Sequence, residues 1–550
     1  MKLSGADILI NCLWEQGVDT VFGYPGGTVL DIYDALYRDG RINHVITAHE
    51  QGAAHAADGY ARATGKTGVV IATSGPGATN LVTGIATAYM DSIPMVAITG
   101  NVGLSMLGRD SFQEVDTCGI TMPITKHNFI VKNISELAST VREAFRIAST
   151  GRKGPVLVDI LKNVQQAEAE YETQKPVAYI PKPVDKAYAA AFTEALKSAK
   201  KPLIMVGGGV ISSGASEEVK AFAEIMDAPV VSTLMGLGAF PSSSPRFLGM
   251  MGMHGTMAAT RSCMAADTII ALGTRFSDRV ALNRDKFAAN KKVLQIDIED
   301  AEINKNINAT VALMADVKEA LKTINACLPR QNHAEWMKEA TELKKKDIID
   351  YNGSVTAYKI LTAAAKITPK DTVVATDVGQ HQMWTAQYYP FETPRSLCTS
   401  GGLGTMGYGF GAAIGAAIGT GKHVIMVTGD GSFNMNLNEL STAVTQNLPI
   451  TVLLMNNKAL GMVRQWQKIF YGKRFSQTDV NKKTDYVKFA EAFGAKGLTI
   501  EKEADIVPVL TEALNTPSPV IVNCIVDHDE NVLPMIKPNA TYDTVMDKIN

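Results

Sequence analysis

Short apolar runs alternate with segments of helical spacing along the whole chain, and this alternation limits the possible folds more than any other feature. Near the start the runs are TVFGYP, HVITA, GVVIAT, MVAITG and PVLVDI. Each run is rich in β-branched residues and too short for a helix of its own, as is typical of buried strands. Because strands that alternate with helices form parallel sheets covered by helices, the sequence predicts an α/β fold.

The same rhythm occurs three times, and 550 residues are too many for one hydrophobic core. The later runs are PLIMVGGG, PVVST, TIIALG and KVLQIDI, then TVVATD, HVIMVTGD, ITVLLMNN and PVIVNCIV. We expect three doubly wound parallel-sheet domains over residues 1–165, 186–328 and 356–535, with the outer two alike in rhythm. The polar segment 165–186 is expected to be a linker, and 329–351 to begin as a charged helix.

The charges of the chain are nearly balanced, with 53 lysine and arginine residues against 55 aspartate and glutamate residues. This balance gives no reason to expect binding to nucleic acid or to a membrane surface. The six cysteines are far apart and form none of the paired spacings of zinc sites or disulfide scaffolds. The first residues, MKLSGADILINCLWEQGV, predict an amphipathic helix rather than a signal or transit segment, so we expect a cytoplasmic protein.

One uncharged stretch, residues 396–421, is long enough to span a bilayer. It contains GGLGTMGYGFGAAIGAAIGTG, in which glycine recurs throughout. Such a sequence predicts tight turns followed by a buried helix of small residues, rather than a membrane span.

Two polar residues follow neighbouring predicted strands, Asp430 after HVIMVT and Asn457 after ITVLLM. The segment between them has helical spacing, so the two strands should be parallel neighbours whose carboxyl ends meet at one edge. Mg²⁺ prefers oxygen ligands of this kind, completed by phosphate oxygens and water. Gly429 and Gly431 would let a phosphate approach the backbone, and Ser432 offers a further donor. Two unrelated tight turns are the alternative, but adjacent strand ends favour a metal–diphosphate site.

This GDG…NN pattern resembles the binding signature of thiamine diphosphate (ThDP) enzymes. The resemblance implies that Asp430, Asn457 and the main-chain carbonyl of Ala459 hold Mg²⁺ on the diphosphate. In HEQGAAHAADGYARATG, Glu50 resembles the glutamate that bonds the aminopyrimidine ring of this cofactor, with which it would exchange a proton. Without the motif, a glutamate after a strand is ordinarily a solvated side chain.

Longer segments, in matching order, resemble the family of catalytic large subunits of acetohydroxyacid synthase, also called acetolactate synthase. They extend from Leu3 to about Pro534 and include GYPGG, TSGPGATNLVTGIATAYMDSIPMVAITG, FQEVDTCGITMPITKHNF, LGMMGMHGT, TRFSDRV, SGGLGTMGYGFGAA and MVRQWQ. The resemblance implies a transferase that condenses two 2-oxoacids with loss of CO₂. Two pyruvates would give 2-acetolactate, and pyruvate with 2-oxobutyrate would give 2-aceto-2-hydroxybutyrate, in the first common step of branched-chain amino acid biosynthesis.

The family resemblance also implies roles for residues at the cofactor. Gly27 and Glu50 would face the pyrimidine, while Gln113 and Lys162 would approach the substrate. Met406 would keep the two rings of the cofactor folded together, although a lone methionine is ordinarily a core residue. The other positions implied to bind ThDP are Val378, Gly379, Gln380, His381, Gly404, Gly429, Asp430, Gly431, Ser432, Asn457, Ala459, Leu460, Gly461 and Met462.

The acceptor pocket would be lined by Met462, Val463 and Trp466. An indole there would favour the ethyl group of 2-oxobutyrate over the methyl group of pyruvate through apolar contact. A tryptophan on a helix is more often a core residue, so this role depends on the GMVRQWQ motif.

A structural FAD is implied for the middle of the chain, although the reaction itself is redox-neutral. A run of glycines after a strand is weak evidence alone, and it is the whole set that resembles the family. The implied FAD positions are Arg152, Gly207, Gly208, Gly209, Met251, Gly252, Met253, His254, Gly273, Thr274, Arg275, Arg279, Asp297, Ile298 and Asp316.

The chain departs from the family pattern at a few positions, none of which removes a catalytic group. Leu161 replaces a proline that would fix the turn before Lys162. The other departures are Ala48, Arg109, Asn163 and Asn434.

Three alternatives remain open from the sequence. The chain could be a flavin-using relative of the pyruvate oxidase type, a FAD-free acetolactate synthase of fermentation, or an inactive homologue that serves as a scaffold. The family resemblance further implies a homodimer or homotetramer, because Glu50 and Asp430 lie in regions that pair across subunits. A separate regulatory small subunit is a further possible partner.

Overall fold

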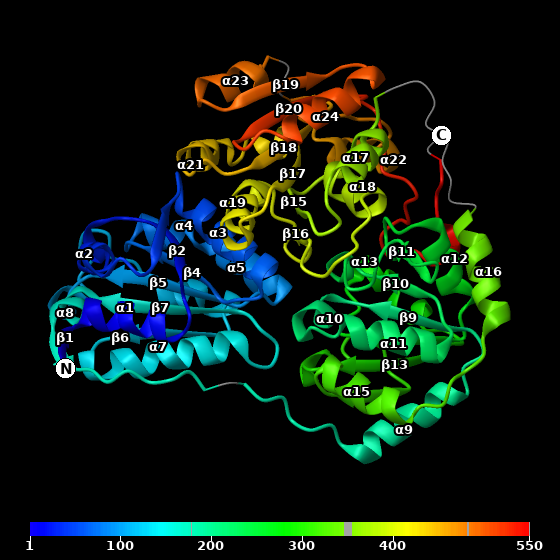
Figure 1. The fold of residues 1–550 in the computed structure, drawn as a ribbon, viewed down its shortest axis with the longest axis horizontal. Helices are drawn as coiled ribbons and strands as arrows, with labels where there is room; N and C mark the ends of the chain where they lie inside the picture. The colour runs from blue at the N-terminus through cyan, green and yellow to red at the C-terminus, as the bar shows by residue number, and fades with distance from the viewer. Residues whose placement is uncertain (178, 346–354, 481–482, 549–550) are drawn as a thin grey trace.

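The computed structural model describes residues 1–177, 179–345, 355–480 and 483–548. It contains three six-stranded sheets, and the strand pairings within all three are parallel. Figure 1 shows them as three blocks around a common centre, each sheet flanked by helices. The predicted α/β fold with three parallel-sheet units is therefore confirmed. We call the units the first, middle and last blocks.

The first block has the strand order β3-β2-β4-β5-β7-β6. Its strands are β2 (Thr20–Tyr24), β3 (Asn43–Ile46), β4 (Gly68–Ala72), β5 (Met95–Asn101), β6 (His127–Val131) and β7 (Pro155–Leu161). Its helices are α1 (Gly5–Glu15), α2 (Leu30–Asp39), α3 (Glu50–Thr64), α4 (Pro76–Asn80), α5 (Val82–Asp91), α6 (Thr117–Thr121), α7 (Ile134–Ser149) and α8 (Lys162–Gln166).

The last block repeats this topology with the order β16-β15-β17-β18-β20-β19, so the outer two blocks are alike, as predicted. Its strands are β15 (Val373–Thr376), β16 (Leu397–Thr399), β17 (Val424–Gly429), β18 (Ile450–Asn456), β19 (Lys496–Ile500) and β20 (Val520–Ile525). Its helices are α17 (Ala357–Ile367), α18 (Gln380–Tyr388), α19 (Tyr408–Thr420), α20 (Asp430–Phe433), α21 (Leu440–Thr445), α22 (Gly461–Phe470), α23 (Tyr486–Ala492) and α24 (Ile506–Leu514).

The middle block has a different order, β11-β10-β9-β12-β13-β14. Its strands are β9 (Pro202–Val206), β10 (Val230–Ser232), β11 (Phe247–Met250), β12 (Thr268–Leu272), β13 (Lys292–Asp297) and β14 (Val311–Met314). Its helices are α9 (Lys186–Lys197), α10 (Gly208–Ser213), α11 (Ser216–Met226), α12 (Met257–Ala265), α13 (Asp278–Ala281), α14 (Arg284–Phe287), α15 (Val317–Cys327) and α16 (Ala334–Lys345). The strand order reverses between β9 and β12, which is where sheets of this topology bind dinucleotides.

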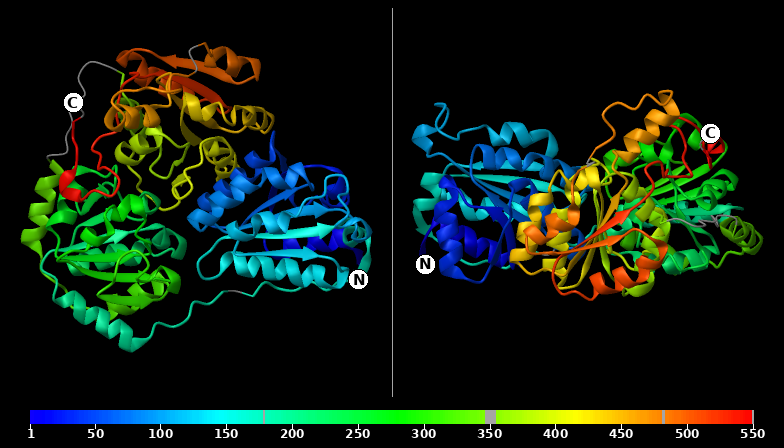
Figure 2. Two further views of the ribbon diagram at one scale, coloured as in Figure 1. Left: turned by 180° about the vertical axis from the view of Figure 1, so that it is seen from behind. Right: turned by 90° about the horizontal axis from the view of Figure 1, so that it is seen from above.

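The glycine-rich stretch forms the buried helix α19, as predicted, and packs against α3 of the first block (Figures 1 and 2). Their backbones nearly touch, because a Cβ on Gly59 would lie 2.2 Å from the carbonyl oxygen of Ala412, and one on Gly415 would lie 1.8 Å from that of Ala56. Only small residues allow this approach. None of the helices that the structure describes is both long enough and apolar enough to cross a membrane.

Three segments lie outside the predicted sheets: the expected linker, the chain after β20 and the predicted helix within 329–351. The segment expected to be a linker contains β8 (Glu168–Glu170), which pairs antiparallel with β1 (Lys2–Ser4). At the other end, the chain after β20 packs on the middle block: Ile536 N donates to Met253 O at 2.8 Å, and the Tyr542 hydroxyl donates to Val280 O at 2.6 Å. The helix predicted within 329–351 is α16, and residues 346–351 lie outside the described residues.

A buried histidine between α3 and α19 should make the folded state less stable in acid. His55 is fully buried there against the Tyr408 ring, with 5.2 Å between ring centroids. Burial, and then the charges of Arg62 and His49, lower the pKa of His55 from 6.5 to about 3. The folded state therefore binds fewer protons than the unfolded chain between these values, and its stability falls as the pH drops from 6.5.

We expect the folded state to lose about 2 kcal/mol from this group between pH 7.5 and pH 5. His55→Met should remove that loss, whereas His127→Met, at an exposed histidine, should not. Urea unfolding midpoints at the two pH values measure the difference. Equal pH dependence in the wild type and His55→Met would rule out His55 as the cause.

Candidate functional site

A pocket lies at the carboxyl edge of the last sheet, where β15, β17 and β18 end. Strands β17 and β18 are parallel neighbours, with Gly429 opposite Met455, so the predicted strand–helix–strand unit is confirmed. The pocket is lined by Val378, Gly379, Gln380, His381, Trp384, Met406, Gly429, Gly431, Ser432, Met455, Asn457, Ala459, Leu460, Gly461, Met462 and Val463. Most of the residues assigned to ThDP from the sequence therefore meet in one place. Gly404 and Asp430 are not among the lining residues: Gly404 has a φ of +72° in the loop before Met406, and Asp430 is fully buried directly after Gly429.

Asp430 and Asn457 extend from adjacent strand ends, as the motif requires. Asp430 is fully buried and begins α20 directly after β17. The Asn457 side chain is fixed at both ends: its Nδ2 donates to Gln380 Oε1 at 3.1 Å, and its Oδ1 accepts from Ala459 N at 3.1 Å. This leaves the second lone pair of Oδ1 for a cation.

Three of the glycines that line the pocket lie where a Cβ would collide with neighbouring side chains. A Cβ on Gly461 would lie 1.9 Å from Gln380 Oε1, and one on Gly429 would lie 2.8 Å from His381 Nδ1. A Cβ on Gly431 would lie 2.5 Å from a methyl carbon of Leu460. The backbone therefore packs closely here, and backbone without side chains is a surface that a phosphate can approach.

His381 presents an unsatisfied nitrogen in this pocket. Its Nε2 is buried and has no hydrogen-bond partner among the described residues. Burial lowers the pKa of His381 to about 3, so the ring is neutral at pH 7. An unpaired buried nitrogen in a concave site is unfavourable unless a ligand satisfies it, and the donor set therefore fits a bound polar cofactor.

The metal position cannot consist of clustered acidic side chains. Across the described ranges, no group of three or more histidine, cysteine, aspartate or glutamate residues could hold a metal ion. The oxygens present are the Asp430 carboxylate, the Asn457 amide and main-chain carbonyls such as that of Ala459. Such a partial set suits Mg²⁺, which keeps water and phosphate ligands.

Sequence reasoning missed three residues of this site. Trp384 follows Gln380 by four positions on α18, and Met455 precedes Asn457 by two, so helical and strand spacing could have identified both. Gln465 carried no local signal. Gln380 Nε2 donates to Gln465 Oε1 at 3.0 Å, and Gln465 Nε2 donates to Val532 O at 3.0 Å, which links the Asn457 amide to the C-terminal segment.

A second hollow of about 590 Å³ opens beside the first. It is lined by Met462, Val463, Trp466, Gln467, Tyr471, Arg474 and Ser476, so it contains all three residues assigned to the acceptor pocket. Met462 and Val463 line both hollows and thus connect them. Trp466 lies on α22 beside the Phe470 ring, at 5.4 Å between centroids.

The four candidates of the first block lie at the carboxyl ends of its strands. Glu50 begins α3 after β3 and accepts a hydrogen bond from Asn80 Nδ2 at 2.9 Å. Lys162 Nζ donates to Gly27 O at 3.2 Å and pairs with Asp31 at 2.7 Å. Gln113, with a φ of +59°, lies against Gly75, where a Cβ would be 2.9 Å from Gln113 Cα.

The departure at Leu161 does not disturb this edge. Leu161 has a φ of −64°, the value that a proline would impose, and α8 begins immediately after it at Lys162. The Lys162 side chain is thus directed to Gly27 without the proline that the family pattern has.

The two halves of the predicted site do not meet within one chain. The described residues that line the pocket all come from the last block, and Gly27, Glu50, Gln113 and Lys162 are not among them. Around the edge of the first block, large apolar side chains are exposed, with Phe112 at 86% and Met122 at 66%. Exposed apolar surface of this kind is typical of an interface.

The candidate FAD residues gather at the reversal point of the middle sheet. Gly207 and Gly209 follow β9, and Gly273 follows β12. Gly209 N donates to Gly273 O at 3.0 Å, and a Cβ on Gly207 would lie 2.2 Å from that oxygen. Gly208 begins α10, and Thr274 is buried beside Gly207.

The loop 251–254, which follows β11, packs against the main chain at Arg279. Met253 N donates to Arg279 O at 2.8 Å, and Met251 and Met253 are buried. A Cβ on Gly252, whose φ is +118°, would lie 2.6 Å from Arg279 O. His254 Nδ1 is buried without a hydrogen-bond partner in the described part of the chain, and burial lowers its pKa to about 4.

The remaining FAD candidates differ in their surroundings. Arg152 of the first block donates to Glu302 Oε1 of the middle block at 2.7 Å, and Arg279 is exposed beside Asp278. Burial raises the pKa of Asp297 to about 6. Asp316 caps α15 by accepting from Lys318 N and Glu319 N, which is a structural role. The other two are Arg275, beside Gly402, and Ile298, which follows β13.

Comparisons with known proteins match the whole chain to one family. Family models match residues 3–120 ("Thiamine pyrophosphate enzyme, N-terminal TPP binding domain"), 189–324 (the "central domain") and 377–524 (the "C-terminal TPP binding domain"). The chain is 46% identical to the "Acetolactate synthase" of Mycobacterium bovis, over 99% of the chain and 91% of that protein. It is 43% identical to the "Acetolactate synthase large subunit" of Haemophilus influenzae, over 100% of the chain and 99% of that protein.

Proposed function

Because the chain belongs to the acetolactate synthase family of thiamine pyrophosphate enzymes, we propose that it joins two 2-oxoacids with loss of CO₂. Two molecules of pyruvate would give 2-acetolactate and CO₂. Pyruvate with 2-oxobutyrate would give 2-aceto-2-hydroxybutyrate and CO₂. This is the first common step in the biosynthesis of valine, leucine and isoleucine.

The observation that carries this proposal is the pocket lined by Asn457 and by the glycines Gly429, Gly431 and Gly461, with the buried Asp430 directly after Gly429. When bound, thiamine diphosphate supplies a carbon centre that holds the electron pair left by decarboxylation. The Asp430 carboxylate, the Asn457 amide oxygen and the Ala459 carbonyl would bind Mg²⁺, which would hold the diphosphate. Met406 would pack between the rings of the cofactor and fix its shape.

Glu50 would accept and return a proton at the aminopyrimidine ring. Within one chain Glu50 does not line the pocket, so this role needs the first block of a second copy. We therefore propose a homodimer, or a tetramer of such dimers, in which each site combines two chains. The exposed apolar side chains around Phe112 support this arrangement.

Mixed dimers test this assembly directly. Glu50→Gln and Asp430→Asn chains with different tags are coexpressed, and dimers that carry both tags are purified. We expect each single variant to be nearly inactive and the mixed dimer to have about half of the wild-type activity, because one of its two sites contains both defects and the other neither. An inactive mixed dimer would mean that each site forms within one chain.

We propose that FAD binds at the reversal point of the middle sheet and serves as a structural group. The close approach of Gly207 and Gly209 to Gly273 and the unpaired His254 nitrogen support this, since both suit a bound dinucleotide. Arg152, Arg275 and Arg279 supply positive charge for its phosphates. Reduction of the flavin by pyruvate within the turnover time would instead favour the pyruvate oxidase alternative.

The acceptor would enter the hollow that Trp466 lines. Competition between pyruvate and 2-oxobutyrate, with and without added FAD, tests this acceptor site. We expect 2-aceto-2-hydroxybutyrate to predominate, and Trp466→Leu to lower this preference about tenfold through lost contact with the extra methylene. Phe470→Leu, at the neighbouring ring, is the matched control. An unchanged product ratio in Trp466→Leu would remove this residue from acceptor selection.

We also propose a cytoplasmic location and a separate regulatory small subunit. The six free cysteines suit a reducing compartment. The Haemophilus relative is described as a large subunit, which supports a smaller partner for this chain as well.

A further inference from the structure

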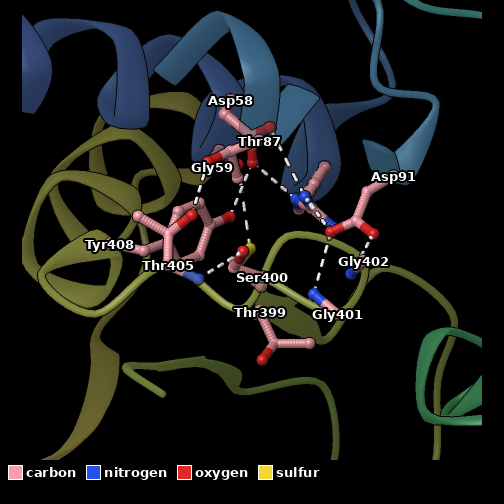
Figure 3. Close-up of polar contacts among 12 residues, drawn as sticks. Asp58, Gly59, Thr87, Asp91, Thr399, Ser400, Gly401, Gly402, Thr405 and Tyr408 are labelled. Atoms are coloured by element: carbon pink, nitrogen blue, oxygen red, sulfur yellow. Dashed lines mark hydrogen bonds and ion pairs between the residues drawn. The ribbon is translucent and has the colours of Figure 1, made fainter. Parts of the chain in front are cut away.

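Asp58, Arg62 and Asp91 form a buried ion-pair cluster between the first and last blocks (Figure 3). Arg62 Nε lies 2.5 Å from Asp58 Oδ1, and Arg62 Nη2 lies 2.9 Å from Asp91 Oδ2. The side chains are 0–4% exposed. A buried ion pair seldom stabilises a fold more than apolar residues would, so the contacts of this cluster, rather than its burial, indicate its role.

Asp91 uses both carboxylate oxygens to hold the backbone of the last block. As the final residue of α5, it accepts from Gly401 N at 2.9 Å and from Gly402 N at 2.7 Å (Figure 3). These adjacent amides belong to the loop 400–407, which connects β16 to α19. Two charge-assisted bonds to neighbouring amides fix the orientation of the peptide between them.

Hydrogen bonds also hold the other end of this loop, at Thr405 and Gly407. Thr405 shares a hydroxyl hydrogen bond with Thr87 of α5 at 2.8 Å, and its amide donates to Ser400 Oγ at 3.0 Å (Figure 3). Gly407 N donates to Ser432 Oγ at 3.2 Å, on the helix that follows the GDG motif. Met406 lies between these anchors and lines the cofactor pocket.

Two residues of the middle block, Met235 and Arg275, also pack against this loop. A Cβ on Gly401 would lie 2.3 Å from Met235 Sδ. A Cβ on Gly402 would lie 2.8 Å from both Asp91 Oδ1 and Arg275 Nη2. The loop is therefore tightly packed at Gly401 and Gly402, and its path is set by contacts from all three blocks.

We propose that Asp91 is a positioning residue for the cofactor pocket: its carboxylate, balanced by Arg62, fixes Gly401 and Gly402 and thereby sets Met406 against the bound thiamine diphosphate. The inference rests on the proposed function in so far as that cofactor occupies the pocket. The ion-pair cluster would then position the cofactor pocket as well as join the first and last blocks.

Asp91→Asn tests the proposal, because the amide group can accept from one of the two glycine amides but not from both. In the cofactor-free protein, the amides of residues 401 and 402 should exchange their hydrogens faster. Affinity for thiamine diphosphate, followed by quenching of tryptophan fluorescence in a pocket that Trp384 lines, should fall about tenfold. The control is Asp371→Asn, at an exposed ion pair with Lys422, which should change neither readout.

A double-mutant cycle separates positioning from general support of the fold. If Asp91 acts through Met406, Asp91→Asn should weaken cofactor binding much less in a Met406→Ala background than in the wild type. Equal losses in the two backgrounds would overturn the proposal. Loss of amide protection with unchanged cofactor affinity would do the same.

Thr87→Val decides the question if Asp91→Asn does not fold, since it removes one hydroxyl, which bonds Thr405 and, within α5, the main-chain carbonyl of Thr83. It should weaken cofactor binding in the same direction but by less, and no change would overturn the proposal. These readouts need no turnover. A chain that binds the cofactor but forms no acetolactate would overturn the proposed function and leave this inference standing.

Discussion

Replacing Glu50 by glutamine should lower kcat by about 10²–10⁴, because a positioned proton-transfer group contributes a factor of that size. Glutamine has nearly the same shape and can still accept the hydrogen bond of Asn80. It cannot take up a proton from the aminopyrimidine ring. The steady-state rate gives the loss, and proton exchange at the reactive carbon of bound thiamine diphosphate, followed by nuclear magnetic resonance, locates it at this step.

The affinity for the cofactor should change little in Glu50→Gln, because the residues proposed to hold the diphosphate lie in the last block. Glu136→Gln, at an exposed glutamate on α7, is the matched control and should behave as the wild type. If Glu50→Gln exchanged the proton at the normal rate, Glu50 would not be the proton-transfer group.

Replacing Asp430 by asparagine should weaken the joint binding of Mg²⁺ and thiamine diphosphate about 100-fold or more, since the buried side chain proposed as a metal ligand loses its negative charge. Asp430 is fully buried at the start of α20, so solvent cannot supply a substitute charge. Calorimetric titration with Mg²⁺ and the cofactor measures this loss. Activity should return in part at high concentrations of both.

Asp371→Asn is the control for this change, since it removes an exposed aspartate of the same block that pairs with Lys422. Its cofactor affinity should equal that of the wild type. Normal Mg²⁺ dependence in Asp430→Asn would contradict the metal site proposed at the ends of β17 and β18.

The sequence predicted the buried strands but not most of the sheet edges. Five of the strands that sequence reasoning missed, β6, β11, β14, β16 and β19, lie at an edge of one of the three sheets. Such strands are short or half-exposed: β16 has three residues, and β19 begins with an exposed lysine. They lack the continuous apolar run that marks a strand covered on both faces.

Some residues of the candidate site could likewise be predicted from the sequence, and others could not. Asp430 and Asn457 could be predicted as neighbours because one strand–helix–strand unit carries both, and local spacing determines their placement. Asp91 and Gln465 carried no such signal, since their partners lie 310 and 67 residues away in sequence. Contacts of this kind depend on how whole blocks pack.

The most direct test of the proposed joining of two 2-oxoacids is the product balance with pyruvate as the only substrate, in the presence of thiamine diphosphate, Mg²⁺ and FAD. We expect the proposed reaction to give one 2-acetolactate and one CO₂ for every two pyruvates consumed, to need both the cofactor and the metal, and to leave the flavin oxidised throughout. Release of CO₂ with acetate or a reduced flavin, in place of acetolactate, would contradict it.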